Sequence, residues 1–455
     1  MKSVAQSFCL VSIGLLLLGY LLGDWGFAHQ GIPPLYVSEI VLVLCLPLLL
    51  VAPEAVGLLD LPSVWLLLAL DVWCLFQTLP YVGIYGLDSF RDGVLYGYSI
   101  FAFIVAAYII DARAIDRLCQ VYGRIVPFCF ILMPFLLLTQ PDDADVIPEN
   151  APLVFLKAGD VAVHLVGISS FMLLGLGAVA PAKRHKHFLV VLALFWLGAA
   201  ATAFWVVSFS RAAILTLVVG MGLVSWVRFD RRQLIGLLGV GVVTIGAFVV
   251  ADVHLELERR DISTSQIIEN ITSIVSGTEH ESAVGQDLVS TAEWRLRWWE
   301  DIVQYCVFGE FFWTGKGFGI NLADDDGYQT DIEGRLRSPH NGHLSFLARS
   351  GVPGLILWLS FLGAFALSLY RSGVRMRKRG LEFWYRFNLW IFSYWMAAMV
   401  DASFDVYLEG PQGGIWFWSI TGLGLATLVL ERRLLKGTVN PADAWAFRHE
   451  IAGSG

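Results

Sequence analysis

Residues 234–250 read LIGLLGVGVVTIGAFVV, and residues 41–50 read VLVLCLPLLL. Neither stretch contains a charged side chain. Water penalises runs of this kind, whereas a bilayer stabilises apolar helices of about 20 residues, the length that spans its hydrocarbon core. We therefore expect lipid to surround much of this chain.

The composition of the whole chain points the same way. Of its 455 residues, 56% are hydrophobic and 15% are charged, and a soluble protein of this length could not bury so much apolar surface. The formal net charge of -8 and the lack of a clustered Lys and Arg groove argue against nucleic acid as a partner. The six cysteines form no CxxC pair and no disulfide framework.

Apolar windows of about 20 residues predict about twelve transmembrane helices. They cover residues 5–23, 35–53, 62–82, 92–111, 115–139 and 158–181, followed by 187–207, 212–229, 233–251, 343–370, 384–406 and 412–430. Lys2 precedes the first window, but no A-x-A cleavage site closes it, so we expect a retained helix rather than a signal peptide.

Basic residues in alternate loops predict the orientation. They are Arg113 and Arg117; Lys183, Arg184 and Lys186; Arg228, Arg231 and Arg232; Arg371, Arg375, Arg377, Lys378 and Arg379; and Arg432, Arg433 and Lys436. All of these clusters fall on one side of the predicted bundle, and the positive-inside rule makes that side the cytoplasm. An even number of spans then places both termini there.

The opposite, outward loops are acidic, and one of them is long. Residues 252–341 form a polar insertion in which Trp294, Trp298 and Ile302 recur near helical spacing. We therefore expect an all-α, polytopic transmembrane helix bundle with one large extracytoplasmic loop domain that contains amphipathic helices. The expected parts are transmembrane helices 1 to 9 in residues 1–251, the loop in 252–341, helices 10 to 12 in 342–431 and a cytoplasmic tail in 432–455.

A histidine stands where this long loop meets the next membrane helix, in the segment SPHNGHL of residues 338–344. Histidine is the side chain most easily poised near neutral pH to take a proton from a hydroxyl, and a membrane boundary suits a lipid-borne substrate. His340 is therefore a candidate general base. The alternative is a helix start, with Pro339 and Asn341 as stop and cap residues and His340 merely interfacial.

Three arginines are candidate anion ligands. Arg211 lies between two apolar runs with almost no loop around it, where a guanidinium is costly unless it snorkels or meets an anion. Arg295 and Arg297 lie in the segment WRLRWW of residues 294–299, whose tryptophans could rest on headgroups or stack on sugar rings. Guanidinium groups bind phosphate oxygens bidentately, although both loop arginines could instead pair with neighbouring acids on a helix face.

These segments together resemble the O-antigen ligase and polymerase superfamily of bacterial envelope glycosyltransferases. The resemblance rests on the pattern His340-Asn341-x-x-Leu344-x-x-Leu347-Ala348-x-x-Gly351, on residues 208–212, on Arg295-x-x-x-Trp299 and on the glycine-rich residues 315–319. It covers about the middle and C-terminal two thirds of the chain. Many members carry an acidic residue where Arg349 stands, so no role is carried over to that position.

The resemblance implies about twelve helices, a large outer loop and an undecaprenyl-diphosphate-linked glycan donor, with no metal, nucleotide sugar or other cofactor. It implies that Arg211 and Arg295, with Arg297 beside them, contact the diphosphate and that His340 assists the acceptor hydroxyl. Asn341 and His343 are expected to support the site. His343 lies one helical turn beyond His340, although an interfacial histidine without a catalytic part is the simpler interpretation.

We therefore expect an inverting, metal-independent glycosyltransferase on the outer face of the bacterial cytoplasmic membrane. Its partners would be the lipid-diphosphate-linked donor, a glycan, lipid or protein acceptor, and membrane lipid. The sequence leaves ligase and polymerase open, and a transporter or flippase of lipid-linked saccharides is the alternative. The carboxylate run at residues 324–326 could hold a cation, but a solvated acidic turn is the more common role of such runs.

Overall fold

The computed structural model describes residues 2–32, 35–50, 52–110, 112–141, 151–176, 188–228, 255–257, 260–262, 283–330 and 334–436. Most of these residues lie in helices, so the all-α prediction is confirmed. The helices are α1 (Lys2–Ala28), α2 (Val37–Leu49), η1 (Pro53–Asp60), α3 (Pro62–Tyr85), α4 (Leu87–Gly97), α5 (Ser99–Ile109), α6 (Ala112–Leu138), α7 (Ala158–Leu173), α8 (Phe188–Phe209), α9 (Arg211–Arg228), α12 (Ala283–Val303), η5 (Gln304–Phe308), α13 (Leu322–Asp325), α14 (Gly342–Lys378), α15 (Glu382–Ala402) and α16 (Pro411–Leu435). Two short antiparallel hairpins pair β1 (Gly31–Ile32) with β2 (Leu35–Tyr36) and β3 (Leu255–Leu257) with β4 (Arg260–Ile262).

Each predicted span in the described residues corresponds to a helix or to a bent pair of helices. The predicted span at residues 233–251 and the basic residues Lys183, Arg184, Lys186, Arg231 and Arg232 lie outside the described residues. By length and apolar composition, six of the described helices could cross a membrane, or up to eight if each bent pair forms one span. The chain is thus a multi-pass membrane protein, and the count of about twelve spans stays a prediction.

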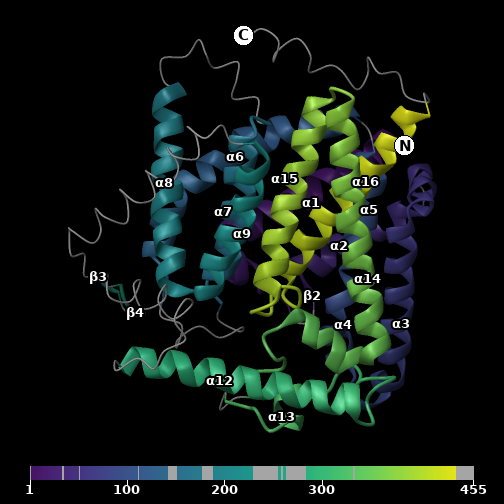
Figure 1. Cartoon of the computed structure of the whole chain (residues 1–455), viewed down its shortest axis with the longest axis vertical. Coiled ribbons are helices and arrows are strands. Elements are labelled where there is room, and N and C mark those ends of the chain that lie inside the picture. The colour runs from purple at the N-terminus through teal and green to yellow at the C-terminus, as the bar shows by residue number, and fades with distance from the viewer. Residues whose placement is uncertain are drawn as a thin grey trace.

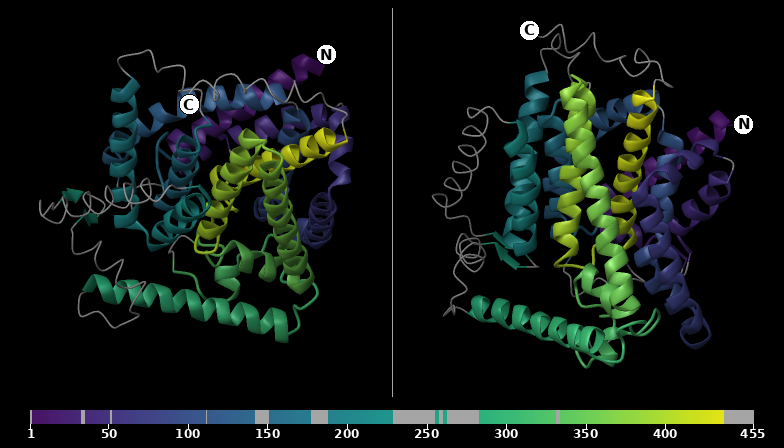
Figure 2. Two further views of the ribbon diagram at one scale, coloured as in Figure 1. Left: turned by 45° about the horizontal axis from the view of Figure 1, so that its top comes forward. Right: turned by 45° about the vertical axis from the view of Figure 1, so that its right-hand side comes forward.

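The long helices run roughly parallel to one another, and α12 lies across one end of the bundle (Figure 1). The views in Figure 2 show the same crossing, and Figure 1 places α13 beside α12 at that end. Helix α14 starts on the bundle side of α12, above it in Figure 1, and ends, with Arg375, Arg377 and Lys378, at the far end of the bundle. The N-terminal end of α1 and the C-terminal end of α16 also lie at that far end (Figures 1 and 2).

Helix α16 forms the centre of the bundle. Every residue from Gln412 to Glu431 is buried, although half of a typical surface helix would face solvent or lipid. Small residues allow this enclosure, because a Cβ atom at Gly422 would lie 2.5 Å from the carbonyl oxygen of Ala102 on α5. Close backbone approach at glycine is a common way for membrane helices to associate, since apolar side chains gain little by leaving lipid for protein.

Helix α14 is broken at Gly351, whose φ of 69° is open to glycine but strained for other residues. Pro353 follows and lacks an N–H group, so several backbone groups of the preceding turn lose their partners within the helix. The loop after η5 supplies replacements: Lys316 N–H donates to Ala348 O at 2.7 Å, and Gly317 N–H donates to Arg349 O at 3.2 Å. In return, Val352 N–H donates to Phe312 O at 2.8 Å.

The same loop explains the glycine-rich residues 315–319. Gly315, Gly317 and Gly319 all have positive φ angles. A Cβ at Gly317 would lie 2.0 Å from the ring of Tyr81 on α3, so the chain threads between α3 and the break in α14 only where side chains are missing. The glycine-rich segment therefore joins the covering helix α12 to the membrane bundle.

We expect Gly422→Ala to destabilise the bundle by about 1–3 kcal/mol, because the added methyl group would meet the α5 backbone rather than a movable side chain. Thermal unfolding of the detergent-purified protein measures the change. Gly363→Ala on α14 is the matched control, since a Cβ there has no neighbour within 4 Å in the described structure. Equal melting temperatures for the two variants would contradict this packing of α16.

Candidate functional site

The segment of residues 338–341 directly precedes α14 and contacts α12. Trp299 Nε1 on α12 donates to Pro339 O at 2.8 Å, which ties the segment to the covering helix. The side chain of Asn341 accepts hydrogen bonds from the N–H groups of His343 and Leu344 at 3.0 and 3.1 Å, so Asn341 is the N-cap of α14. His340, between these two anchors, has a φ of 52°, a conformation that costs free energy for a residue with a Cβ.

His340 is hydrogen-bonded to a carboxylate that the sequence analysis did not single out. Its Nδ1 lies 3.1 Å from Oδ1 of Asp405 in the loop between α15 and α16. About a quarter of the His340 side chain is exposed (26%), so a ligand can reach it. Within the described part of the chain Nε2 makes no hydrogen bond, which leaves the outer ring nitrogen for a substrate.

The surroundings of Asp405 hold its carboxyl group ionised. Burial by itself would raise the pKa of Asp405, but the hydrogen bond to His340 and the positive charge of Lys157 lower this pKa well below its usual range. An ionised carboxylate can only accept hydrogen bonds, so the shared proton belongs to Nδ1 of His340. With the proton of Nδ1 directed at Asp405, Nε2 is the ring nitrogen that can offer a lone pair to a substrate, as a general base requires.

Lys157, just before α7, is the cation that faces this carboxylate. Burial alone would lower the pKa of Lys157. The negative charges of Asp405 and of the nearby Asp160, Asp24 and Asp401 outweigh this effect and raise the pKa above its usual value, so the ammonium group keeps its charge. The backbone N–H of Lys157 also donates to Oδ2 of Asp24 at 2.6 Å, which fixes the start of α7 against α1.

Two of the predicted arginines lie at the same end of the bundle as His340. Arg295 on α12 donates from Nη1 to the carbonyl oxygen of Phe404 at 3.0 Å, next to Asp405 in the chain. Burial lowers the pKa of Arg295, and the negative charge of Asp405 partly offsets this. Its buried Nε–H has no partner among the described residues, an unfavourable state unless a ligand supplies an acceptor.

Arg211 is the first residue of α9, whose start is capped by Ser210, the acceptor of the Ala213 N–H at 3.2 Å. Its guanidinium lies near enough to that of Arg295 for the two positive charges to repel each other. Two neighbouring guanidinium groups form a site that favours an anion with several oxygens, such as a diphosphate. The structure therefore brings His340, Arg295 and Arg211 to one end of the bundle, although they come from the segment before α14, from α12 and from α9.

The structure does not bring Arg297 to this group. Positions 295 and 297 lie about 200° apart around a helix, so their side chains leave α12 on nearly opposite faces. Arg297 is exposed and donates from Nη2 to Glu293 Oε2 at 3.1 Å, the helix-face pair that was the alternative interpretation of its sequence. Exposed pairs of this kind contribute little to stability.

His343 has a packing role in the structure. Trp358 Nε1 donates to His343 Nδ1 at 2.9 Å, so the His343 proton lies on Nε2, which is 3.1 Å from the hydroxyl oxygen of Ser403. Both ring nitrogens are thereby used. Because His340 precedes the N-cap of α14, the expected helical i, i+3 relation between the two histidines does not exist.

The charged residues around the glycine-rich loop form a second network. Asp92 on α4 accepts hydrogen bonds from Arg337 Nε at 3.2 Å and Arg337 Nη2 at 3.1 Å, and its Oδ2 lies 2.8 Å from Nη1 of the fully buried Arg349. The N–H of Gly319 donates to the same carboxylate at 2.9 Å. Arg349 is thus a structural cation that fastens the loop to α4 and α14.

The carboxylate run at residues 324–326 is only partly solvated. Asp326 is buried and accepts hydrogen bonds from Trp298 Nε1 at 2.6 Å and from Tyr305 at 3.2 Å, while Lys316 pairs with both Asp325 and Asp326. The ammonium group of Lys316 therefore lies at the place where the sequence allowed a bound cation. Among the described residues no group of three or more His, Cys, Asp or Glu side chains has the arrangement of a metal site.

Asp405 and Lys157 are the residues that sequence reasoning missed. Both lie at the ends of predicted spans, where ionisable side chains are costly and therefore informative. Asp405 belongs to the segment DASFD of residues 401–405, directly after an apolar run, and Lys157 follows the apolar residues 152–156. What the sequence could not supply was their partner, since His340 and Asp405 lie 65 positions apart.

Comparison with known protein families bears on the same part of the chain. Residues 193–359 match the family model described as O-antigen ligase. The matched segment runs from α8 into α14 and includes Arg211, Arg295 and His340, whereas Asp405 lies outside it. No curated protein matches the chain. The match supports a place for this chain in the O-antigen ligase and polymerase superfamily of membrane glycosyltransferases.

Proposed function

We propose that this protein transfers a glycan from a polyprenyl-diphosphate-linked donor to an acceptor hydroxyl at the outer face of the bacterial cytoplasmic membrane. The observation that carries the proposal is the hydrogen bond between His340 Nδ1 and Asp405 Oδ1, beside which Arg295 binds the carbonyl oxygen of Phe404. A base and an anion-binding cation thus meet at one loop. The O-antigen ligase match supports a lipid-linked glycan donor and a glycan acceptor in general.

In the proposed reaction, Nε2 of His340 takes the proton of the acceptor hydroxyl as its oxygen attacks the anomeric carbon of the donor sugar. Asp405 keeps the imidazole in the required tautomer and stabilises the imidazolium that forms, as the carboxylate does in a Ser-His-Asp triad. A single displacement of this kind inverts the configuration at the anomeric carbon. The attacking oxygen gains a carbon bond as the bond to the diphosphate breaks.

The leaving diphosphate carries the electron pair of the broken bond, so its oxygens gain negative charge in the transition state. Arg211 and Arg295 are the groups that we assign to this charge, since guanidinium hydrogen bonds to phosphate strengthen as the charge develops. Their mutual repulsion in the free enzyme would be relieved by the bound anion. We therefore expect transfer without an added divalent cation, because the two arginines supply the stabilisation.

Two features favour an enzyme over a transporter of lipid-linked saccharides. A transporter keeps its ionisable residues near the bilayer midplane in broken helices that can face either side. Here Arg295 lies on α12, which crosses one end of the bundle (Figure 1), and His340 follows Pro339, whose carbonyl oxygen accepts a hydrogen bond from α12. The break of α14 is filled by the glycine-rich loop. The geometry leaves ligase and polymerase equally compatible, since both use the same donor site.

His340→Ala should lower the transfer rate roughly 10²- to 10⁴-fold with little change in donor affinity, the usual loss for a general base. Arg295→Ala should weaken donor binding as well as transfer, because its contact exists before and during the reaction. Both parameters are measured with purified protein in nanodiscs and a polyprenyl-diphosphate glycan. His343→Gln is the control and should keep its rate while losing thermal stability. Near-normal transfer by folded His340→Ala would remove the base assignment.

Asp405→Asn should also slow transfer, by roughly 10²- to 10⁴-fold, because an amide can present its N–H to His340 and stabilise the wrong tautomer. Donor affinity should change little, which separates this positioning role from that of Arg295. The comparison variant is Asp324→Asn, which makes the same chemical change on an exposed carboxylate. Rates for Asp405→Asn within threefold of the wild type would show that His340 does not depend on Asp405.

Cysteine labelling tests the proposed orientation. The six natural cysteines are all buried, so an introduced exposed cysteine gives a specific signal. Glu300→Cys on α12 should react in intact cells with a reagent that cannot cross the membrane, whereas Arg377→Cys should react only after lysis. Both positions are exposed in the structure, so accessibility depends only on the side of the membrane. Labelling of position 377 from outside would reverse the proposed topology.

A further inference from the structure

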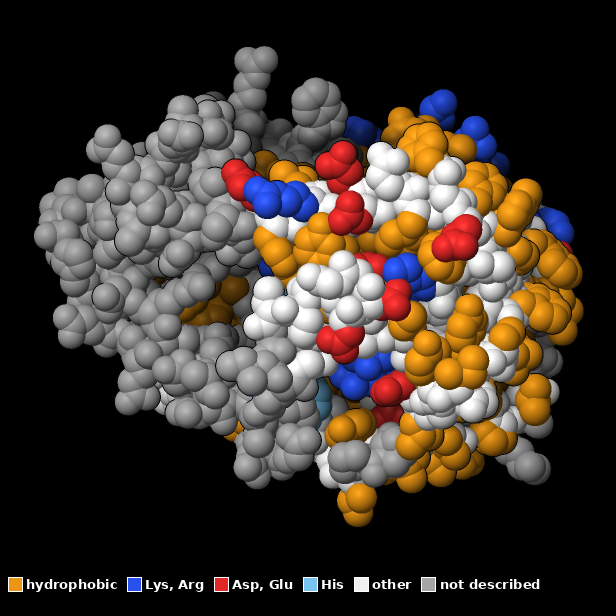
Figure 3. Space-filling model, turned by 90° about the horizontal axis from the view of Figure 1, so that it is seen from below, with side chains coloured by type: hydrophobic (Ala, Val, Ile, Leu, Met, Phe, Trp, Pro, Cys, Tyr) orange, Lys and Arg blue, Asp and Glu red, His pale blue; other side chains and the backbone are white. Residues whose placement is uncertain are grey.

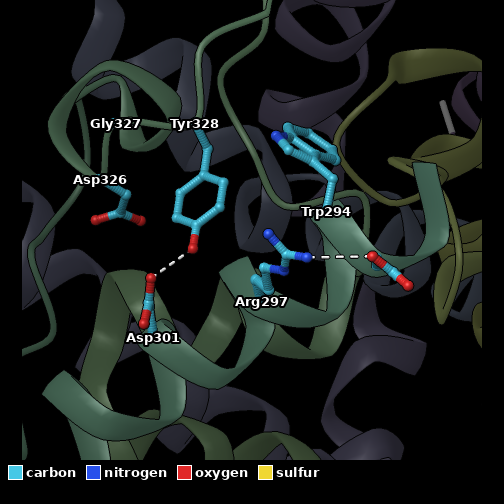
Figure 4. A pocket seen from close by; sticks show the side chains of 7 residues that line it. Trp294, Arg297, Asp301, Asp326, Gly327 and Tyr328 are labelled. Atoms are coloured by element: carbon cyan, nitrogen blue, oxygen red, sulfur yellow. Dashed lines mark hydrogen bonds and ion pairs between the residues drawn. The ribbon is translucent and has the colours of Figure 1, made fainter. Parts of the chain in front are cut away.

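A pocket of about 510 Å³ lies on the face of α12 that carries Arg297. Its α12 side is formed by Trp294, Arg297 and Asp301, which recur at the i, i+3, i+7 spacing of a single helix face. Tyr328 from the loop after α13 closes the opposite side. Figure 4 shows these four side chains turned toward the same space. Neither the donor site nor the family match assigns a role to this pocket.

The aromatic walls of the pocket are rigid. Tyr328 stacks on the buried Trp298 with ring centroids 5.3 Å apart and an interplanar angle of 8°, so one of its faces is fixed against the core of the α12 region. Trp294 packs edge-on against both of these rings, with centroids 5.4 Å from Trp298 and 6.1 Å from Tyr328. The half-buried rings of Trp294 and Tyr328 therefore form a preformed apolar surface with little freedom to lose on binding.

The polar side chains of the pocket are also held in position. The Tyr328 hydroxyl donates to Asp301 Oδ2 at 2.5 Å, and this bond raises the pKa of Tyr328 to about 12, so the phenol stays protonated. Arg297 Nη2 donates to Glu293 Oε2 at 3.1 Å. These bonds use one oxygen of each carboxylate and one of the five guanidinium N–H groups, so donors and acceptors remain at fixed places.

We propose that this pocket is a saccharide-binding subsite for sugar units of the glycan that lie beyond the reacting unit. This inference rests on the proposed function, because glycan transfer is what would bring a saccharide to the pocket. A pyranose ring has an apolar C–H face that packs on an aromatic ring, and hydroxyl groups around its edge that both donate and accept hydrogen bonds. The rings of Trp294 and Tyr328 can pack against the apolar face of the sugar. The side chains of Asp301, Glu293 and Arg297 can hydrogen-bond to the hydroxyl groups at its edge.

Charge argues against a phosphate in the same pocket. Glu293, Asp301 and Asp326 contribute three carboxylates to its lining. Arg297 pairs with Glu293 and Lys316 pairs with Asp326, but no cation of the described ion pairs faces Asp301, so the lining keeps a net negative charge. Like charges would raise the free energy of a bound diphosphate, whereas hydroxyl groups of a sugar hydrogen-bond to carboxylates readily. Viewed from this end of the molecule, acidic and basic side chains are interspersed over the described surface rather than gathered into one basic patch (Figure 3).

The position of the pocket fits a chain that extends away from the reacting bond. Arg295 and Trp299 leave α12 toward Phe404 and Pro339 of the candidate site, whereas Arg297 faces the pocket. The two faces of a helix are separated by roughly 10 Å, its diameter with side chains. A saccharide that spans this distance can belong to the donor or to the acceptor. The pocket would recognise both through the same aromatic and hydrogen-bonding contacts.

Direct binding of lipid-free glycans to the full-length protein tests the proposal. One probe is the saccharide released by mild acid from the polyprenyl-linked donor, and the other is the acceptor glycan freed of its lipid. Saturation-transfer NMR in detergent gives the dissociation constants, in a His340→Ala background so that no transfer occurs. We expect Trp294→Ala to weaken binding of one probe about tenfold, the size of a lost aromatic contact, and the probe affected identifies the source.

Two further variants separate binding from folding. Arg297→Ala alters only an exposed side chain and should weaken the same probe several-fold, so a misfolded Trp294→Ala would not leave the proposal undecided. Trp313→Ala is the matched control, because it removes an exposed tryptophan outside the pocket and should bind like the wild type. Unchanged affinity in Arg297→Ala and in folded Trp294→Ala, or no binding of either probe to the wild type, would overturn the subsite.

The same data keep the two proposals apart. If the pocket variants lose glycan affinity but wild-type protein transfers no glycan, the subsite stands and the transferase proposal is wrong. If wild-type protein transfers glycan and the pocket variants bind both probes normally, the subsite is wrong and the transferase proposal is unaffected.

Discussion

Inside a bilayer every backbone N–H and C=O group must find a partner within the protein, and the break of α14 is where this constraint shapes the molecule. Gly351 and Pro353 free the carbonyl groups of the turn that precedes them. Ala348 and Arg349 receive N–H groups from the glycine-rich loop, and Ser350 receives the indole N–H of Trp73 from α3 at 2.9 Å. A helix defect that would be unstable alone thus becomes the attachment point of the segment that follows α12.

The position of the candidate site follows from this attachment. With the loop fixed in the break, Asp92 neutralises the buried Arg349 and holds Arg337, and residue 337 leads directly into the segment that carries His340. A complete buried charge cluster adds little free energy of folding, but removing one of its partners leaves an unpaired buried charge at a high cost. This network therefore specifies the path of the loop more than it adds stability. The strained φ of His340 persists because Trp299 and Asn341 fix both of its neighbours.

The fold could be predicted from the sequence where a single physical signal dominated. Apolar length gave the helix positions, and the Asn341 side chain two residues before His343 was recognisable as a cap. The bend between α4 and α5, at 43°, and the break at Gly351 carry weaker signals, since glycine and proline are common in membrane helices. For the candidate site, His340 and the arginines could be singled out as candidates because their residue types are rare near lipid.

Partners across the fold could not be predicted, and this limited the interpretation of Arg297 most. Its sequence neighbours suggested that every arginine near the tryptophans serves one anion, but a helix turns by about 100° per residue and separates positions 295 and 297. The two faces of α12 consequently have different chemistry: Arg295 approaches the loop of Asp405, and Arg297 shares its face with Asp301 and aromatic rings. In the proposed function, one amphipathic helix would thus hold the diphosphate on one side and sugar units on the other.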